Sequence, residues 1–274
     1  MSSCAHPDSG ALFFALFWID RSVKKEVDMT KSLCGKAALV TGGSRGIGAA
    51  IVRRLANDGA AVAFTYASSD AAARALVAEI EGQGGRALAL RADSADAQAV
   101  RQAVDAAAEA FGGLHLLVNN AGILVGGLVE DYALADFDRM FAVNVRSAFV
   151  AVQAALKHME RGARIVITGS VVADRVGFAG SSVYAMTKGA VASMARGLAR
   201  DLGPCGITVN VVQPGPTDTD MAPKSAYGER LEPLMALGRM GHDSEIAGMV
   251  AYLAGPDASF VTGAALTVDG GYLA

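Results

Sequence analysis

Cysteine and histidine are scarce in this sequence, and neither type is spaced as in a disulfide framework or a metal site. The 274 residues contain three cysteines (Cys4, Cys34 and Cys205) without a Cys-x-x-Cys pair, and four scattered histidines. An odd number of widely separated cysteines is typical of reduced thiols in a cytosolic protein. We therefore expect a cytoplasmic protein without a metal site.

An excess of one charge and long apolar runs are also lacking. Lys and Arg number 24 against 27 Asp and Glu, a formal net charge of −3, which offers no basic footprint for nucleic acid or an anionic membrane. The apolar run at residues 11–19 is about half as long as a membrane-spanning helix requires. It also lacks the basic stretch and Ala-x-Ala site of a secretory signal. We expect neither a nucleic-acid nor a membrane partner.

Residues 1–34 differ from the rest of the chain. We interpret them as an N-terminal extension, either disordered or the product of a misassigned start. Met29 is a plausible natural start, because it opens a short polar segment just before the first predicted strand. A short amphipathic anchor is the alternative for residues 1–28.

Apolar residues are abundant, at 52% against 19% charged residues, which excludes disorder and predicts a large core. From Lys36 onward, short apolar strands alternate with segments of helical periodicity. The predicted strands are 37–40, 61–65, 86–90, 114–119, 164–168, 207–212 and 264–268; the predicted helices are 47–56, 71–80, 96–111, 136–160, 184–202 and 243–254. This alternation predicts an α/β fold over residues 35–274, a single doubly wound Rossmann-type domain whose parallel seven-stranded sheet has helices on both faces.

A glycine-rich turn separates the first predicted strand from the first helix. The segment Thr41-Gly-Gly-Ser-Arg-Gly-Ile-Gly48 places glycines where a backbone must turn tightly and approach a pyrophosphate. Its expected cofactor contacts are Gly42, Ser44, Arg45, Gly46, Ile47 and Gly48. A glycine-rich turn without a ligand is the alternative, which the position at the first strand–helix crossover disfavours.

The end of the second predicted strand indicates which nicotinamide cofactor binds. NAD sites place an acidic residue about 20 residues after the glycines, but no acid precedes Asp70 here. Arg45 supplies a guanidinium for a phosphate, and Tyr66, Ser68 and Ser69 add hydroxyl groups. We therefore predict NADP(H). In the alternative interpretation Arg45 is a solvated charge and the serines only cap a helix.

Tyr184 and Lys188 lie four residues apart on one face of a predicted helix. Ser170 ends the preceding strand, so all three side chains can meet where parallel strands open a ligand crevice. A neighbouring ammonium is expected to lower the pKa of the phenol well below its usual value of about 10, which suits proton transfer to an alkoxide. Ser170 would stabilise the developing charge on the substrate oxygen. Taken singly, each residue also has a purely structural interpretation.

Together these motifs resemble the short-chain dehydrogenase/reductase family over residues 35–274. The resemblance adds an Asn119-Asn-Ala-Gly122 segment, Asn144, and Pro214-Gly215 followed by Thr219. It implies that Asn144 positions a water in the proton relay, that Asn119 supports the cofactor crevice, and that the subunits form a homotetramer or homodimer. The further cofactor contacts that it implies are Asp93, Ser94, Asn120, Ala121, Gly122, Tyr184, Lys188, Pro214, Gly215, Thr217 and Thr219.

One departure from the family concerns the segment between Ser170 and Tyr184, which is one residue longer than usual. Together with residues 212–220 it is similar to a bacterial subgroup associated with cyclic-di-GMP binding. The leading hypothesis is an NADPH-dependent oxidoreductase acting on a carbonyl or secondary alcohol, of 3-oxoacyl type or a small ketone. The alternative is a nucleotide-binding regulator that sequesters a ligand such as cyclic-di-GMP. Residues 221–240 are expected to form a lid over a moderately apolar substrate.

Overall fold

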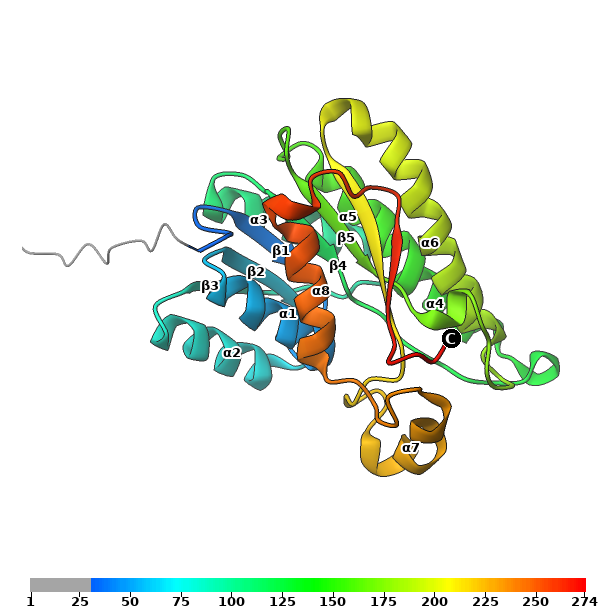
Figure 1. The fold of residues 1–274 in the computed structure, drawn as a ribbon. Coiled ribbons are helices and arrows are strands. Elements are labelled where there is room, and N and C mark those ends of the chain that lie inside the picture. Colours follow the sequence, from blue (N-terminus) through cyan, green and yellow to red (C-terminus); the bar gives the residue numbers. More distant parts are fainter. Residues whose placement is uncertain (1–30) are drawn as a thin grey trace, which may run out of the picture.

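The computed structural model describes residues 31–274, in which seven strands form one parallel sheet with the order β3-β2-β1-β4-β5-β6-β7 (Figure 1). The strands are β1 (Ala37–Val40), β2 (Ala61–Tyr66), β3 (Arg86–Arg91), β4 (Leu116–Asn119), β5 (Arg164–Thr168), β6 (Thr208–Pro214) and β7 (Ala265–Val268). The order reverses beside β1, so the carboxyl ends of β1 and β4 flank the crevice where such folds bind ligands.

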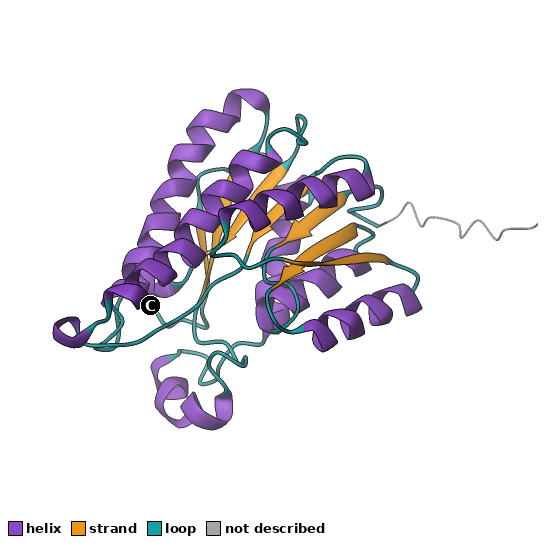
Figure 2. Ribbon diagram, turned by 180° about the vertical axis from the view of Figure 1, so that it is seen from behind, coloured by secondary structure: helices purple, strands orange, loops and turns teal. Residues whose placement is uncertain are grey.

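Helices cover both faces of the sheet (Figure 2). The α-helices of the described residues are α1 (Gly46–Asn57), α2 (Asp70–Gly82), α3 (Ala97–Phe111), α4 (Leu134–Phe141), α5 (Ser147–Ala155), α6 (Ser182–Leu202), α7 (Lys224–Leu231) and α8 (Asp243–Ala254), of which α7 lies away from the sheet. Helices α1, α2 and α8 pack in one apolar cluster, and α3, α5 and α6 pack in a second. Within β1, Val40 faces the first cluster and Leu39 the second, which is why this strand is apolar throughout. The predicted fold class is confirmed.

The predicted N-terminal extension lies almost entirely outside the described residues. Of its last four residues, Leu33 is 3% exposed and belongs to the apolar cluster of α1. Its backbone N–H also donates to Asp58 O at 2.9 Å. Within residues 31–274, no helix has both the length and the apolar character needed to cross a membrane.

The long helical stretch predicted over residues 136–160 is present from Leu134 to Ala155, but it is not one regular α-helix and it ends earlier than predicted. Helix α4 ends at Phe141, a π-helical turn occupies Ala142–Arg146, and α5 ends at Ala155. The widened turn follows from the side chain of Asn144, which bonds to a neighbouring loop instead of facing solvent. Hydrophobic periodicity does not reveal such an inserted residue, because apolar positions continue on both sides of it.

Strand β6 extends two residues further than predicted, to Pro214. Gln213 and Pro214 pair with Thr267 and Val268 of β7. A proline lacks the N–H that a central strand needs, so the sequence suggests an end there. The extension carries the chain to the crevice before it enters the lid segment, defined as residues 221–240.

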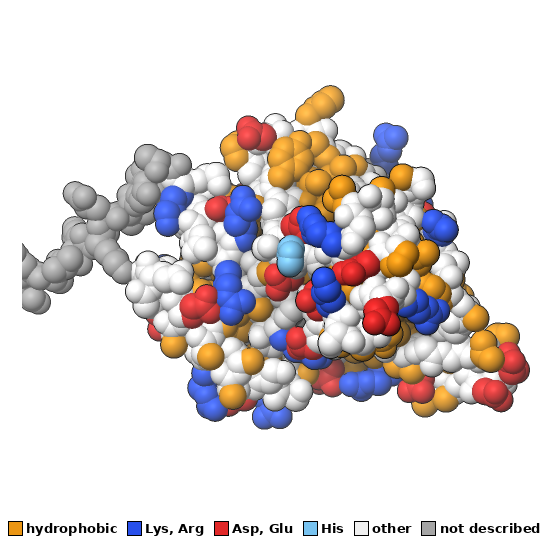
Figure 3. Space-filling model, turned by 60° about the horizontal axis from the view of Figure 1, so that its bottom comes forward, with side chains coloured by type: hydrophobic (Ala, Val, Ile, Leu, Met, Phe, Trp, Pro, Cys, Tyr) orange, Lys and Arg blue, Asp and Glu red, His pale blue; other side chains and the backbone are white. Residues whose placement is uncertain are grey.

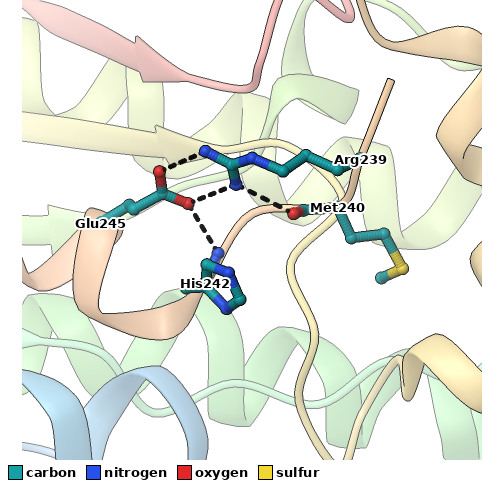
Figure 4. A network of polar contacts seen from close by, with 4 residues as sticks. All are labelled: Arg239, Met240, His242 and Glu245. Atoms are coloured by element: carbon teal, nitrogen blue, oxygen red, sulfur yellow. Dashed lines mark hydrogen bonds and ion pairs between the residues drawn. The ribbon is translucent and has the colours of Figure 1, made fainter. Parts of the chain in front are cut away.

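The lid segment lies between β6 and α8, and its helix α7 projects beyond the sheet (Figure 1). The residues before and after the segment are hydrogen-bonded to each other. Gly241 N donates to Pro216 O, and Asp218 N donates to Gly241 O, both at 2.9 Å. At the C-terminal end of the lid segment, Arg239 donates two hydrogen bonds of 2.9 and 2.8 Å to the carboxylate of Glu245 in α8 (Figure 4). Arg239 and the backbone N–H of His242 together lower the pKa of Glu245 to about 2.

The side of the molecule that carries α7 has no field of one charge. Figure 3 shows acidic and basic side chains interspersed over this face, with apolar side chains between them. A ligand binding here therefore depends on local groups rather than on long-range electrostatic attraction.

Candidate active site

The turn between β1 and α1 has no room for a side chain at Gly42, Gly43 and Gly48, as expected where a backbone approaches a phosphate closely. Gly42 and Gly46 have φ values of +65° and +51°, which favour glycine. A Cβ on Gly43 would lie 2.5 Å from the Cβ of Phe64, and one on Gly48 would lie 2.2 Å from the carbonyl oxygen of Gly42. The first amides of α1 have no partner within the helix and are suited to an anion.

Asn120 holds this glycine turn against the end of β4. Its Nδ2 donates to Thr41 O and Gly42 O, both at 3.1 Å. The hydroxyl of Thr41 accepts in turn from the backbone N–H groups of Asn120 and Ala121, both at 3.0 Å. Four hydrogen bonds therefore fix the turn before a ligand arrives.

The side chain of Asn119 lies in a different environment from that of Asn120. Its Nδ2 donates to Ala148 O of α5 at 3.3 Å, and its buried Oδ1 has no hydrogen-bond partner in the structure. The side chain thus holds β4 to α5 rather than facing the crevice. Gly122 does reach the crevice, because a Cβ on it would lie 3.6 Å from Lys188 Nζ.

The side chains at the end of β2 form a polar edge beside the glycine turn. The Tyr66 hydroxyl donates to Asp70 Oδ1 at 2.8 Å, and Ser68 is exposed. Arg45 is exposed as well, and its Nη1 lies 3.3 Å from Asp220 Oδ2 at the entrance of the lid segment. A Cβ on Gly46 would lie 3.6 Å from the Cβ of Thr219, so the turn and the lid entrance are adjacent.

The other predicted cofactor contacts lie at neighbouring strand ends. The Asp93 carboxylate accepts from Ala95 N at 2.9 Å, which shapes the turn after β3 that also carries Ser94. Pro214 and Gly215 end β6, and Thr217 is buried just beyond, with its hydroxyl donating to Gly215 O at 2.9 Å.

The structure brings Ser170, Tyr184 and Lys188 together at the carboxyl end of β5. Ser170 follows β5 and hydrogen-bonds Tyr184, which lies in the first turn of α6. Lys188, one turn further, is 5% exposed. Its Nζ donates to Thr168 O at 2.9 Å and lies 5.6 Å from the centre of the Tyr184 ring.

The predicted lowering of the Tyr184 pKa is wrong for the chain without ligands. Burial raises the pKa of Tyr184 to about 12, although the hydrogen bond from Ser170 opposes this rise. Burial also lowers the pKa of Lys188 to about 8. The ammonium is directed at Thr168 O and lies under the ring, so desolvation outweighs its attraction for a phenolate. Tyr184 is therefore poised as a proton donor, and Lys188 titrates in the range in which enzymes work.

Asn144, in the π-helical turn, is held on three sides. Its Oδ1 accepts from Ile123 N at 2.8 Å, and its Nδ2 donates to Ile123 O at 2.9 Å and to Thr187 Oγ1 at 3.0 Å. Both Nδ2 protons are therefore used within the protein. Only its backbone carbonyl is suited to hold the water predicted for the proton relay.

The sequence and the fold match those of known proteins. A family model described as enoyl-(acyl carrier protein) reductase matches residues 42–273. The chain belongs to the short-chain dehydrogenase/reductase family. The predicted family and its oxidoreductase class are thereby confirmed.

Individual members of this reductase family are similar to this chain in sequence and in structure. The cyclic-di-GMP-binding biofilm dispersal mediator protein of Escherichia coli (strain K12) is 51% identical over 87% of this chain and 97% of that protein. A short chain dehydrogenase from Burkholderia cenocepacia J2315 in complex with NADP is 55% identical, with a TM-score of 0.87 over 89% of this chain and 100% of that chain. A blue fluorescent protein from a metagenomic library in complex with NADPH is also 55% identical, with a TM-score of 0.86 over the same shares. The predicted NADP(H) cofactor agrees with these two neighbours.

The sequence interpretation missed Thr187, which contacts the reductase site, and the pair of Arg175 and Tyr272, which lies at the loop after Ser170. Thr187 is fully buried between Asn144 and the backbone of Tyr184, and its hydroxyl donates to Tyr184 O at 2.7 Å. Arg175 and Tyr272 contact each other across the extended loop after Ser170. Thr187 had a weak sequence signal, since it precedes Lys188 on the same helix, whereas no local pattern pairs residues 97 positions apart.

Proposed function

We propose that this chain reduces a carbonyl compound with NADPH, using Tyr184 as the proton donor. The observation that carries the proposal is the meeting of the half-buried Ser170 and Tyr184 with the buried Lys188, near a turn whose glycines leave no room for side chains at three positions. Assay of ketones and 3-oxoacyl thioesters with NADPH and with NADH, followed at the nicotinamide absorbance, tests it. Oxidation of NADPH by at least one carbonyl compound is expected, and no turnover across the panel would contradict it.

The bound cofactor supplies a hydride to the carbonyl carbon, and the chain provides the proton and the charge stabilisation. Ser170 donates a hydrogen bond to the carbonyl oxygen and stabilises the negative charge that develops there. Tyr184 transfers its phenolic proton to that oxygen, which yields the alcohol. Lys188 returns a proton to Tyr184, and a water held at Asn144 O links Lys188 to solvent.

The cofactor would lie across the carboxyl ends of β1, β4 and β6. Backbone amides of the glycine turn suit its pyrophosphate, and Lys188 suits the nicotinamide ribose. The residues proposed to hold it are Gly42, Ser44, Arg45, Gly46, Ile47, Gly48, Tyr66, Ser68, Asp93, Ser94, Asn120, Ala121, Gly122, Tyr184, Lys188, Pro214, Gly215, Thr217 and Thr219.

The Arg45→Gln variant is expected to bind NADPH about tenfold to a hundredfold more weakly, because a charge-assisted hydrogen bond to the 2′-phosphate contributes about 1.5–3 kcal/mol. Its affinity for NADH should stay within about twofold, since NADH lacks that phosphate. Titration of NADPH and NADH fluorescence measures both dissociation constants. Equal weakening of both cofactors would show that Arg45 does not recognise the phosphate.

Asp220→Asn is the matched variant on the other side of this ion pair. The Asp220 carboxylate lies 3.3 Å from Arg45 and adds a negative charge beside the proposed phosphate site. NADPH should therefore bind more tightly to Asp220→Asn than to the wild-type chain, with the difference shrinking at high salt. Weaker NADPH binding would mean that the ion pair closes over the cofactor instead of competing with it.

Reduction is expected to become slower as the pH rises through about 8. Burial lowers the pKa of Lys188 to about 8, so its proton-returning form is lost in that range, while Tyr184 with a pKa of about 12 stays protonated. The kcat/KM of NADPH-driven reduction, measured from about pH 6 to about pH 10, should fall and that of alcohol oxidation should rise. A flat reduction profile would exclude Lys188 from the proton path.

Binding of a cyclic dinucleotide is the second candidate function. It is favoured by the 51% identity to a relative described as cyclic-di-GMP-binding. Calorimetric titration of the wild-type chain with cyclic-di-GMP, with and without NADPH, tests it. Submicromolar binding without any carbonyl reductase activity would make this the main function.

The proposed assembly is a homodimer or homotetramer in the cytoplasm. Leu134 of α4, Phe149 of α5 and Met186 of α6 are large apolar side chains that stay 78%, 49% and 49% exposed. Burial of such side chains between subunits would remove apolar surface from water. Light scattering of the purified chain tests the assembly, and a monomer would contradict it.

A further inference from the structure

The C-terminal tail, defined as residues 269–274, has a fixed conformation after β7. The Asp269 carboxylate accepts from Gly271 N and Leu273 N, both at 2.9 Å. Tyr272 is 4% exposed and packs with Val171 and Met240 in a third apolar cluster. The last residues are therefore part of the packed structure.

This tail contacts the end of β6 and the lid segment. A Cβ on Gly215 would lie 2.6 Å from the Cβ of Asp269, so the two backbones are in close contact. Leu237 N, in the lid segment, donates to Gly270 O at 3.0 Å. The tail is thus packed between the strand that ends at the proposed nicotinamide site and the lid segment.

The tail also holds the substrate loop, defined as residues 171–181, which joins Ser170 to α6. Arg175 Nη1 donates to Tyr272 O at 2.9 Å, and the Arg175 guanidinium lies 5.3 Å from the centre of the Tyr272 ring. A Cβ on Gly177 would lie only 2.2 Å from the Tyr272 hydroxyl oxygen but 3.5 Å from its Cζ. The loop therefore fits against a tyrosine at this position only while residue 177 has no side chain.

We propose that Tyr272 and Arg175 are positioning residues that set the substrate loop and thereby the affinity for the carbonyl substrate. The inference rests on the proposed function. The loop directly follows Ser170 and leads into the first turn of α6, which carries Tyr184. A displaced loop therefore alters the site in which the substrate binds. The glycine turn after β1, which would hold the pyrophosphate, lies on other elements, so we expect this contact to change NADPH affinity much less than substrate affinity.

A compensating pair of substitutions tests the contact. Gly177→Ala places a methyl group against the Tyr272 hydroxyl, and the backbone permits it because Gly177 is not among the glycines with positive φ. We expect KM for the carbonyl substrate to rise about tenfold with kcat within about threefold, as when binding rather than chemistry is lost. Tyr272→Phe alone should stay near the wild type. The double variant should return KM to within about threefold, because the nearest remaining ring atom lies at contact distance.

Three measurements separate this role from general damage. The NADPH dissociation constant should stay within about twofold in every variant, and Gly82→Ala, where a Cβ meets nothing within 4 Å, should behave as wild type. Arg175→Met should raise KM as Gly177→Ala does. Failure of Tyr272→Phe to rescue Gly177→Ala, or an equal loss of NADPH affinity, would overturn the proposal.

Failure of the proposed function would be recognised separately. If the wild-type chain reduced no carbonyl compound, hydrogen exchange of amides in residues 171–181 would still report the contact. Gly177→Ala should speed this exchange, and the double variant should restore the wild-type rate. Unchanged exchange in Gly177→Ala would overturn the positioning role whatever the activity.

Discussion

Tyr184→Phe is expected to lower kcat for carbonyl reduction by about a thousandfold, because the proton that must reach the alkoxide is removed with the hydroxyl. The ring and its place above Lys188 remain, so NADPH affinity should stay within about twofold. Burial raises the pKa of Tyr184 to about 12, so the wild-type phenol carries its proton throughout the working pH range. Steady-state kinetics and NADPH fluorescence titration measure the two quantities.

The control for this variant is Tyr252→Phe, which removes a hydroxyl from a tyrosine of α8 that is 44% exposed. It should retain wild-type kcat and KM. Wild-type turnover by Tyr184→Phe would show that the phenol is not the proton donor.

Lys188→Met is expected to lower kcat by about a thousandfold as well, since the phenol is no longer resupplied with a proton. Unlike Tyr184→Phe, it should also weaken NADPH binding, because Lys188 is the proposed ribose ligand. The fall of kcat/KM around pH 8 should be absent from its residual activity. A variant that kept this fall would show that another group titrates there.

Comparing the stability of Lys188→Met with that of the wild type independently tests the direction of the Lys188 pKa shift. The folded-state pKa of Lys188 is lowered to about 8, so between there and its usual value of 10.5 the unfolded chain binds more protons. The free energy of unfolding of the wild type should therefore rise with pH across that window relative to the variant. Chemical denaturation at several pH values measures the difference. An opposite slope would mean that the folded protein favours the charged ammonium.

The sequence was sufficient to predict the seven strands along the chain and that the candidate site residues meet at one edge of the sheet. Runs such as Ala37–Val40 are apolar at every position, which distinguishes strands buried on both faces from helices. Because parallel strands end at one edge of a sheet, the glycine turn, Ser170 and Tyr184 could be placed together without coordinates.

Properties that depend on packing at a distance could not be predicted in the same way. The attraction of Lys188 for a phenolate is visible in a four-residue spacing, but the larger effect of burial on Tyr184 is not. The π-helical turn at Asn144 depends on a hydrogen bond to Ile123, and the support of the substrate loop depends on Tyr272 at the other end of the chain.

The most direct test of the central claim uses NADPH that carries deuterium at the transferable position of the nicotinamide ring. The purified chain is incubated with a ketone that it consumes, and the product alcohol is analysed by mass spectrometry. The account predicts one deuterium on the carbinol carbon of the product, and about a thousandfold less of this labelled product from Tyr184→Phe in the same time. Consumption of NADPH without label in the product would contradict it.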